Sequence, residues 1–324
     1  MKTVFLDKKP NIDDIDSQEK VIALGYFDGV HLGHQEVIKK AVAIAREKGL
    51  EATVMTFYPH PAVVLKPSAK RADSLTPLKA KERLIEQLGV DLLIFVTFDL
   101  ELSRLSPQEF VDYYLINLHA KHIVAGFDYT FGRMAQGNMD NIDTYTRSMF
   151  GYTVIPRVER FGDKVSSTRI RALITGGSVD EASMLLDHPY QTSGVVVHGD
   201  QRGRELGFPT ANVETEEPYL MPGEGVYAVR LIVGSDSFDG ICSLGKRPTF
   251  YDEKHAIIAV EVYLLNFNGN LYGRTVFIDW YKKLRGQEKF NSADELIQQM
   301  EEDKKQTAVY FSNLTDAAKR KTKT

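Results

Sequence analysis

The sequence has little of what extracellular, membrane and nucleic-acid-binding proteins usually carry. Its single cysteine, Cys242, excludes an internal disulfide framework and a zinc site built from cysteines. No apolar run is long enough to span a bilayer, and the N-terminus lacks the apolar core of a signal peptide. A net charge of −4 gives no electrostatic reason to expect nucleic acid as a partner. These absences predict a cytoplasmic enzyme that binds neither a membrane nor nucleic acid.

The length and the pattern of the chain predict two domains. At 324 residues the chain exceeds the usual size of one domain. The spacing of apolar residues changes near His188-Pro189, and neither an internal repeat nor a low-complexity linker is visible. We therefore expect an N-terminal domain over residues 1–186 and a C-terminal domain over residues 187–324.

In the first domain, short apolar runs alternate with stretches of helical periodicity. This alternation predicts an α/β fold, a parallel sheet with helices on both faces, in which ligands bind beyond the carboxyl ends of the strands. The predicted strands are Val21–Gly25, Ala52–Phe57, Leu92–Thr97, His122–Ala125 and Thr153–Pro156, and the predicted helices are Gln35–Lys48, Leu78–Leu88, Pro107–Leu118 (with Ser106 as N-cap) and Asn138–Phe150.

In the second domain, short β-branched and aromatic runs are separated by turn residues. Several short strands joined by turns predict a small antiparallel β-barrel. Asn291–Glu295 is typical of a helix start, so a closing helix is expected to about Phe311. Cys242 lies in an apolar run, which indicates a buried thiol. The predicted strands are Val195–His198, Val226–Val233, Ser237–Leu244, Ile257–Leu265 and Thr275–Tyr281.

The most informative segment is Gly25-Tyr-Phe-Asp-Gly-Val-His-Leu-Gly-His34, which joins a predicted strand to a predicted helix. The start of a helix presents free backbone N–H groups and the positive end of the helix dipole, which together suit phosphate. His31 and His34 lie three residues apart, so both can face one side of the first turn. Gly29 and Gly33 allow close approach of a phosphate chain. Imidazoles placed there can donate hydrogen bonds to oxygens whose charge grows during attack at phosphorus.

Further polar segments follow other predicted strands of the first domain. The prolines of Thr56–Pro61 stiffen a loop. Asp128 follows another strand, where it can also be a turn residue that bonds its own backbone. The segment Val165-Ser-Ser-Thr-Arg-Ile-Arg171 opens a helix with three hydroxyls and two arginines, which can cap the helix or bind a phosphate.

Two stretches of the second domain carry candidate chemistry. The segment His198-Gly-Asp-Gln-Arg-Gly-Arg-Glu-Leu-Gly-Phe-Pro-Thr-Ala-Asn212 is glycine-rich, and its backbone amides can bind phosphates. The Thr210 hydroxyl and the Asn212 carbonyl are hard oxygen ligands that suit Mg²⁺ on ATP phosphates. Glu261 lies between valines, a pattern typical of the polar face of a half-buried strand. Gly240–Lys246 has Walker A spacing, but we reject it because it lacks the strand-then-helix context of a P-loop.

These motifs together resemble those of a known family. The segment Gly25–His34 is similar to the HxGH signature of the nucleotidylyltransferase superfamily, in the longer form found in the bacterial bifunctional FAD synthetases. Ser166–Arg171 resembles the same family's Ser-Ser-Thr-x-x-Arg motif, and His198–Asn212 resembles the riboflavin kinase core with its Pro-Thr-Ala-Asn element. Class I aminoacyl-tRNA synthetases share the histidine motif but need a lysine-rich loop that this chain lacks. The resemblance extends from about Val21 to Phe311.

The resemblance implies two activities. A riboflavin kinase would transfer the γ-phosphate of ATP to riboflavin, and an FMN adenylyltransferase would convert FMN and ATP to FAD and pyrophosphate, with Mg²⁺ as cofactor. Catalytic roles fall on His31, His34, Arg171 and Glu261, the last as the base toward the ribityl hydroxyl, and metal ligation falls on Thr210 and Asn212. Nucleotide or flavin binding falls on Gly25, Phe27, Asp28, Gly29, Gly33, Pro59, His60, Asp128, Ser166, Ser167, Thr168, Gly199, Arg204, Gly207 and Pro209.

Three residues depart from the family's pattern. The family often has His, Asp and Asn where this chain has Tyr263, Asn266 and Ser243. These departures leave open a second interpretation, a paralogue that has lost one or both activities and binds flavin as a regulator. An RNA-binding barrel is disfavoured by the acidic charge balance. The sequence predicts no oligomeric state.

Overall fold

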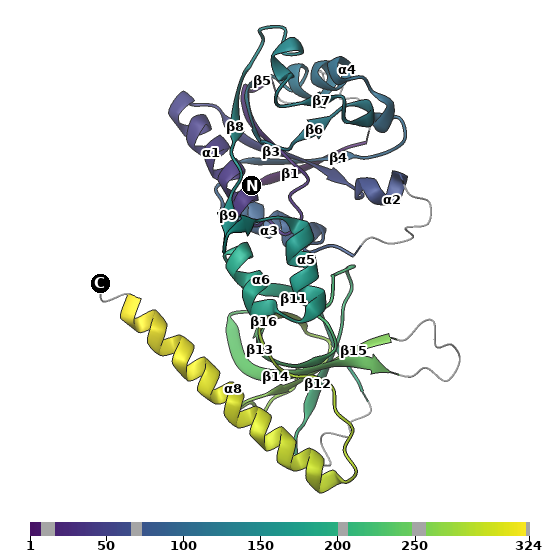
Figure 1. Ribbon diagram of the computed structural model, residues 1–324, viewed down its shortest axis with the longest axis vertical. Helices are drawn as coiled ribbons and strands as arrows, with labels where there is room; N and C mark the ends of the chain where they lie inside the picture. The colour runs from purple at the N-terminus through teal and green to yellow at the C-terminus, as the bar shows by residue number, and fades with distance from the viewer. Residues whose placement is uncertain (8–16, 66–72, 200–206, 248–256, 322–324) are drawn as a thin grey trace. The chain divides into compact units, whose positions relative to one another are not determined.

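The computed structural model describes residues 1–7, 17–65, 73–199, 207–247 and 257–321. The chain forms two compact units, residues 1–167 and 168–324. The first holds a parallel sheet and the second a closed barrel (Figure 1). Within the described ranges, no helix is both long enough and apolar enough to cross a membrane.

The sheet of the first unit has six strands, and every neighbouring pair is parallel. The predicted parallel α/β fold is therefore confirmed. The strand order reverses between β2 and β5, and ligands of open α/β sheets bind at such a switch point. In spatial order the strands are β1 (Lys2–Leu6), β4 (Leu92–Thr97), β3 (Glu51–Tyr58), β2 (Lys20–Leu24), β5 (Ala120–Gly126) and β8 (Gly151–Ile155).

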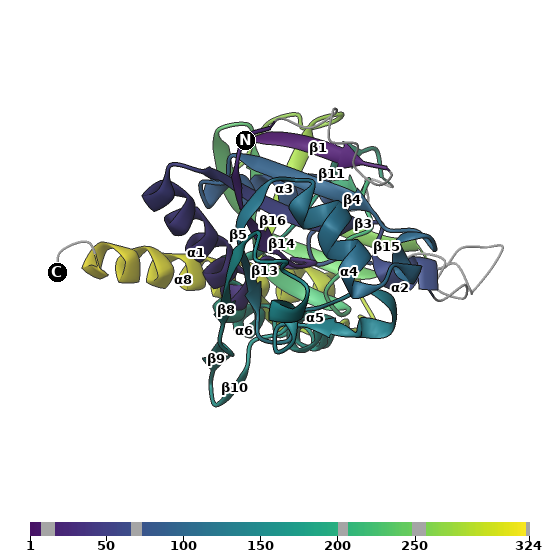
Figure 2. The same ribbon diagram turned by 90° about the horizontal axis from the view of Figure 1, so that it is seen from above.

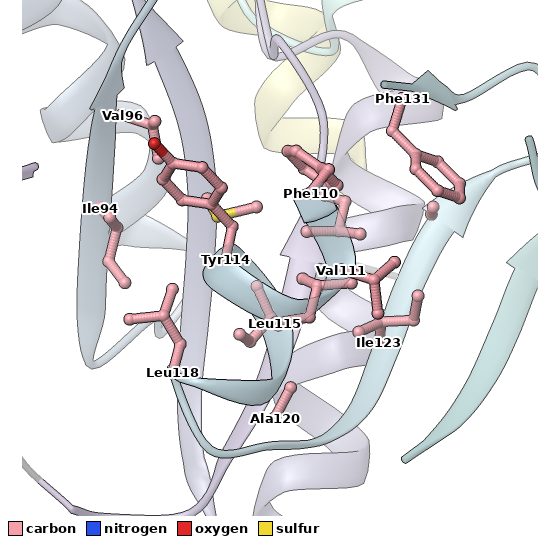
Figure 3. Packing of buried hydrophobic residues seen from close by; sticks show 14 of the residues in the cluster. Ile94, Val96, Phe110, Val111, Tyr114, Leu115, Leu118, Ala120, Ile123 and Phe131 are labelled. Atoms are coloured by element: carbon pink, nitrogen blue, oxygen red, sulfur yellow. The ribbon is translucent and has the colours of Figure 1, made fainter. Parts of the chain in front are cut away.

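Alternate residues of the central strands enter two separate cores. Val21 and Ala23 of β2 pack with α1 and α3, whereas Ile22 and Leu24 pack with α4 and the π-helical turn η3 that follows it. Figure 3 shows Phe110, Leu115 and their neighbours in this second core, beside strand residues such as Ile94 and Ile123. The helices are α1 (Leu32–Lys48), α2 (Pro61–Leu65), α3 (Leu78–Gln87) and α4 (Pro107–Val111), and the short helical turns are η2 (Leu102–Arg104), η3 (Asp112–Ile116), η4 (Arg133–Ala135) and η5 (Ile142–Thr144).

Residues 138–150, predicted as a helix, do not form one, and that prediction is wrong. Local side-chain hydrogen bonds compete with the helix: Asn138 Oδ1 accepts from the backbone N–H of Asp140 and Asn141, and Asn141 Oδ1 accepts from the Asn138 N–H. Arg147 and Ser148 then adopt positive φ angles of 50° and 57°. The region instead holds turns and η5. The small strands β6 (Thr130–Phe131) and β7 (Gly137–Asn138) pair just before it, and β9 (Glu159–Arg160) and β10 (Asp163–Lys164) form a hairpin further along the chain (Figure 2).

The second unit is a closed antiparallel barrel, as predicted from the sequence. Helix α6 (Val179–Leu186), which follows α5 (Ser167–Gly176), packs against β11 and β16. Cys242 is buried in the barrel as a free thiol, and Gly240–Lys246 lies within a continuous strand, which excludes a P-loop. Around the barrel the strands are β11 (Tyr190–Val197), β12 (Thr210–Glu214), β15 (Ile257–Leu264), β14 (Asp236–Arg247), β13 (Gly225–Val233) and β16 (Thr275–Arg285).

Helix α8 (Ala293–Lys321) packs against β14 and continues about ten residues beyond its predicted end. Its start is confirmed, because the Ser292 hydroxyl accepts from the Glu295 N–H. Arg285 at the end of β16 ties the helix to the barrel. The guanidinium donates to both carboxylate oxygens of Asp303 at 2.9 to 3.2 Å, and Asp303 is 2% exposed.

Breaking this buried pair should destabilise the second unit. We expect Arg285→Met to lower its free energy of unfolding by about 3 kcal/mol, because the substitution leaves a buried carboxylate without its cation. Trp280 is the single tryptophan and is fully buried in the barrel, so its fluorescence reports this unit alone. Lys304→Met, which removes an exposed cation from α8, is the control and should change stability by less than about 0.5 kcal/mol. Equal changes in the free energy of unfolding for the two substitutions would contradict a stabilising role of the Arg285–Asp303 pair.

Candidate active sites

The turn between β2 and α1 is backbone-strained. Phe27 and Val30 have positive φ angles of 52° and 42°, and Gly29 has a φ of 88°. A left-handed conformation costs an L-residue roughly 1–2 kcal/mol, and a β-branched residue such as Val30 rarely adopts it. The turn therefore has to be held by contacts from other elements.

Asp28 supplies the main anchor of this turn. It is 2% exposed, and its Oδ1 accepts hydrogen bonds from Ser74 Oγ at 2.7 Å and from the backbone N–H groups of Leu75 and Thr76 at 3.0 and 3.2 Å. Thr76 completes the contact, because its hydroxyl accepts from the Gly29 N–H at 2.8 Å. The carboxylate thus fixes the turn to the segment before α3.

The two histidines of the turn are stacked, buried and neutral. Their ring centroids lie 3.6 Å apart with an interplanar angle of 13°. His31 is the N-cap of α1, and its Nδ1 accepts from the His34 N–H at 3.3 Å. Burial lowers the pKa of His31 to about 4, and burial together with the charge of its neighbours lowers the pKa of His34 well below the usual range. Both rings are therefore uncharged imidazoles near pH 7.

Two glycines of the motif make room for aromatic rings. A Cβ on Gly25 would lie 2.7 Å from Cζ of Phe27, and a Cβ on Gly33 would lie 3.3 Å from Cε1 of His31. Phe27 in turn packs edge-on against His34, with ring centroids 5.3 Å apart. Glycine at these positions lets the aromatic side chains approach the backbone closely.

The carboxyl ends of the neighbouring strands bring further predicted residues to the same edge of the sheet. After β5, Asp128 forms an ion pair with Lys164, and both charges act on His31. After β3, Pro59 precedes His60, whose ring packs edge-on against Tyr26 at 4.3 Å. The sheet therefore gathers His31, His60 and Asp128 around its switch point.

Ser167, the last residue of the first unit, contacts this turn as well. Ser167 Oγ donates to the Asp28 carbonyl at 2.9 Å, and Ser166 precedes it in the chain. Thr168 and Arg171 follow in the first turns of α5, beyond the division between the two units. The hydroxyl of Ser167 is thus used to fix the turn that carries the histidines.

Sequence reasoning missed a buried lysine of this site. Lys81 on α3 is 4% exposed and donates to the Tyr26 carbonyl at 2.8 Å. Burial lowers its pKa to about 8. The helical spacing of Leu78, Lys81 and Ile85 puts this lysine on the apolar face of α3, which is the feature of the sequence that could have revealed it.

In the second unit, the predicted metal ligands and base share one face of the barrel. Asn212 lies directly opposite Glu261, and Thr210 lies opposite Tyr263, so these four side chains project from the same face. Val262, on the other face, is fully buried inside the barrel. The face thus carries a hydroxyl, an amide and a carboxylate, all oxygen donors that suit Mg²⁺.

Three of the four binding residues predicted in the segment before β12 lie among the described residues. Gly199 lies against Asn212, where a Cβ would come within 2.2 Å of Nδ2, so a larger residue would displace the Asn212 side chain. Gly207 has a φ of 82°, and Pro209 immediately precedes β12. Arg204 lies outside the described residues. No group of three or more His, Cys, Asp or Glu side chains that could hold a metal occurs in the described part of the chain.

The residues that depart from the family's pattern are part of this face or close to it. Ser243 pairs with Glu261 across the strands, and its hydroxyl accepts from Gln287 Nε2 at 3.2 Å. The rings of Tyr263 and Phe208 pack together, with their centroids 5.1 Å apart. Asn266 has a φ of 57°, a left-handed conformation that asparagine tolerates better than most residues.

The fold and the two sites define a class of protein. It combines a nucleotide-binding parallel domain, with paired imidazoles at its switch point, and a barrel that presents a carboxylate beside hard oxygen ligands. Residues 13–169 match the family model described as FAD synthetase, and residues 186–311 match the model described as riboflavin kinase. The chain belongs to the family of bifunctional riboflavin kinase/FMN adenylyltransferases.

Relatives with this name are similar over nearly the whole chain. The protein from Listeria monocytogenes is 46% identical over 98% of this chain and 100% of its own length. The Bacillus subtilis protein is 43% identical over 97% of this chain and 99% of its own. A crystal structure from Streptococcus pneumoniae, described as a macrolide-efflux protein, is 35% identical with a TM-score of 0.86 over 94% of this chain and 98% of that one.

The neutral state of the two histidines can be tested directly. In an NMR titration we expect His31 to protonate with a midpoint near pH 4 and His34 with a midpoint well below that of an exposed histidine, because burial disfavours the imidazolium. The variants His31→Gln and His34→Gln assign the two resonances. Midpoints near 6.5, the value of an exposed histidine, would contradict the buried, neutral pair.

Proposed function

We propose that this chain makes FAD from riboflavin in two steps, each in its own part of the chain. The first step phosphorylates riboflavin with ATP and gives FMN. The second joins FMN to the AMP part of a further ATP and releases pyrophosphate. The observation that carries the proposal is the similarity to relatives named for both activities, one of which covers 98% of this chain.

We assign adenylyl transfer to residues 1–186 and the kinase to residues 187–324. The two family-model matches, which end at residue 169 and begin at residue 186, support a boundary in this region. Because α6 packs against β11 and β16, an isolated kinase fragment is expected to need α6 as well. A cytoplasmic location stays a prediction.

In the adenylyl transfer, a phosphate oxygen of FMN attacks the α-phosphorus of ATP, and the bond from that phosphorus to the β-phosphate oxygen breaks. No protein nucleophile is required, so the chain's part is to position the phosphates and stabilise the growing negative charge. His31 would donate from Nε2, because its Nδ1 already accepts the cap hydrogen bond. His34 Nδ1 is buried with no partner among the described residues, and a bound substrate can complete it. Arg171 would add a charged bidentate contact.

The other residues predicted for the adenylyl-transfer site would hold the nucleotide and the flavin. The turn residues shape the phosphate site and present the free amides of α1. Asp128, Pro59 and His60 border it from the neighbouring strands. This binding set comprises Gly25, Phe27, Asp28, Gly29, Gly33, Pro59, His60, Asp128, Ser166, Ser167 and Thr168.

In the kinase reaction, the ribityl hydroxyl oxygen of riboflavin attacks the γ-phosphorus of ATP, and ADP leaves. We propose that Glu261 accepts the proton of that hydroxyl. Its place on the face of Thr210 and Asn212 supports this role, because base and phosphate-binding groups then adjoin. Gly199, Gly207 and Pro209 would let the loop before β12 follow the ATP phosphates, together with Arg204.

Mg²⁺ would accompany ATP in this site. Thr210 and Asn212 are the protein residues proposed to hold it, because their hydroxyl and amide oxygens are hard donors on the face that Glu261 shares. When bound, the ion neutralises charge on the ATP phosphates. The departures from the family's pattern at Ser243, Tyr263 and Asn266 affect none of these proposed ligands or the proposed base. A purely regulatory flavin-binding role is therefore the less favoured alternative.

The proposal is tested by incubating the purified chain with riboflavin and Mg·ATP and separating riboflavin, FMN and FAD by chromatography. FMN should appear first and FAD should follow with pyrophosphate. Flavin that stays bound but unconverted would instead support the regulatory paralogue.

The histidines should serve FAD formation alone. We expect His31→Ala or His34→Ala to slow FAD formation from FMN by about a hundred- to a thousandfold, the usual cost of a lost donor to transition-state charge. Riboflavin phosphorylation should stay near the parent rate. His122→Ala is the control, since His122 bonds Thr153 between β5 and β8, away from the turn. Equal loss of both activities in a folded variant would refute the division of labour.

Glu261 and Asn212 should fail in different ways. Glu261→Gln keeps the shape of the side chain but removes the base, so phosphorylation should fall while riboflavin and Mg·ATP still bind. Asn212→Ala removes a proposed metal ligand, so Mg·ATP binding should weaken along with turnover. Glu214→Gln, an exposed change on the same strand, is the control. Binding isotherms and half-reaction assays distinguish a loss of turnover alone from a loss of both binding and turnover. Phosphorylation by Glu261→Gln at the parent rate would contradict the proposal that Glu261 is the base.

A further inference from the structure

Lys81 is a buried cation that the two reactions leave without a role. Lys20, which is also buried, lies 3.3 Å from the Glu51 carboxylate. Lys81 is 4% exposed and forms no such ion pair with any residue that the structure describes. A buried charge without a counter-ion is costly and is usually retained only where its other contacts matter.

Among the described residues, the hydrogen bond and the ring contact of Lys81 both involve Tyr26. Its Nζ donates to the Tyr26 carbonyl at 2.8 Å and lies 4.3 Å from the centroid of the Tyr26 ring. Thr56 Oγ1 donates to the same carbonyl at 2.9 Å. The lysine therefore holds Tyr26, which begins the strained turn, from α3, while Thr56 holds it from β3.

This anchor lies one residue before the first strained position. Phe27 follows Tyr26 directly, and its ring packs against His34. A shift of the Tyr26 carbonyl would therefore move the aromatic support of that histidine. Displacements of about 1 Å caused by a remote substitution can cost about a hundredfold in rate.

In the described part of the chain, several charged groups act on Lys81 and the two histidines. Lys81 faces His34 and the anchoring carboxylate of Asp28, and His34 also faces His31. His31 is in turn affected by Asp28, Asp128 and Lys164. The positive charge of Lys81 lowers the pKa of His34, so its loss should raise that pKa toward the usual value.

We propose that Lys81 is a positioning residue for adenylyl transfer: through the Tyr26 carbonyl it fixes the turn that carries His31 and His34, and its charge faces His34. The inference rests on the proposed function. It adds to the site a residue on α3, outside every motif of the sequence.

Lys81→Met tests the proposal, because it removes the charge and the hydrogen bond but keeps an unbranched chain of similar length. We expect kcat for FAD formation from FMN to fall about a hundredfold, with riboflavin phosphorylation by the same protein unchanged. Lys79→Met makes the same replacement at an exposed position of α3 and should leave both rates near the parent values. Lys81→Arg, which keeps a charged donor, should retain more activity than Lys81→Met.

The titration of His34 separates this role from simple packing. In Lys81→Met the NMR midpoint of His34 should rise, whereas in Lys81→Arg it should stay low. A parental kcat in Lys81→Met, or a lost kcat with an unchanged His34 midpoint, would overturn the proposal. If Lys81→Met does not fold, Lys81→Gln is judged by the same two readouts. If the parent chain makes no FAD, the proposed function fails, while the His34 titration still decides whether Lys81 acts on that histidine.

Discussion

The hydrogen bonds that hold the turn between β2 and α1 are the constraint on which the first site depends. Phe27 and Val30 occupy backbone conformations that they disfavour. The buried Asp28 carboxylate, bonded to the segment of residues 74–76, keeps them there. This turn places the stacked histidine pair at the N-terminus of α1 and at the switch point of the sheet. Strain of this kind is typical of sites whose shape must be fixed before the substrate arrives.

The two units meet different chemical demands with different means. The proposed adenylyl transfer needs donors to developing charge, and each imidazole, kept neutral by burial, has one N–H that it can donate. The proposed kinase site needs a base beside oxygen ligands, and the two-residue period of the barrel strands provides it by placing Asn212 opposite Glu261. Each site therefore follows from the geometry of its own fold.

Much of this arrangement could be predicted from the sequence. The continuous apolar runs of β2 and β4 indicate buried parallel strands, and the histidine motif lies where the strand-to-helix pattern placed it. The helix expected over residues 138–150 failed because periodicity does not register that Asn138 and Asn141 can bond their own backbone. β12 (Thr210–Glu214) was missed, although Ala211 and Val213 alternate with polar residues, because the strand has only five residues and its first three were interpreted as part of the glycine-rich segment. The role of Asp28 as an anchor depends on partners 46 to 48 residues away, which no local pattern encodes.

The central claim is that residues 1–186 carry out one complete reaction and residues 187–324 the other, and that FMN links them. A complementation assay tests this most directly: His34→Ala and Glu261→Gln proteins are given riboflavin and Mg·ATP, first separately and then mixed. The account predicts that the first alone stops at FMN, that the second alone leaves riboflavin unchanged, and that the mixture makes FAD. FAD from either variant alone, or none from a mixture in which each retains its own half-reaction, would contradict it.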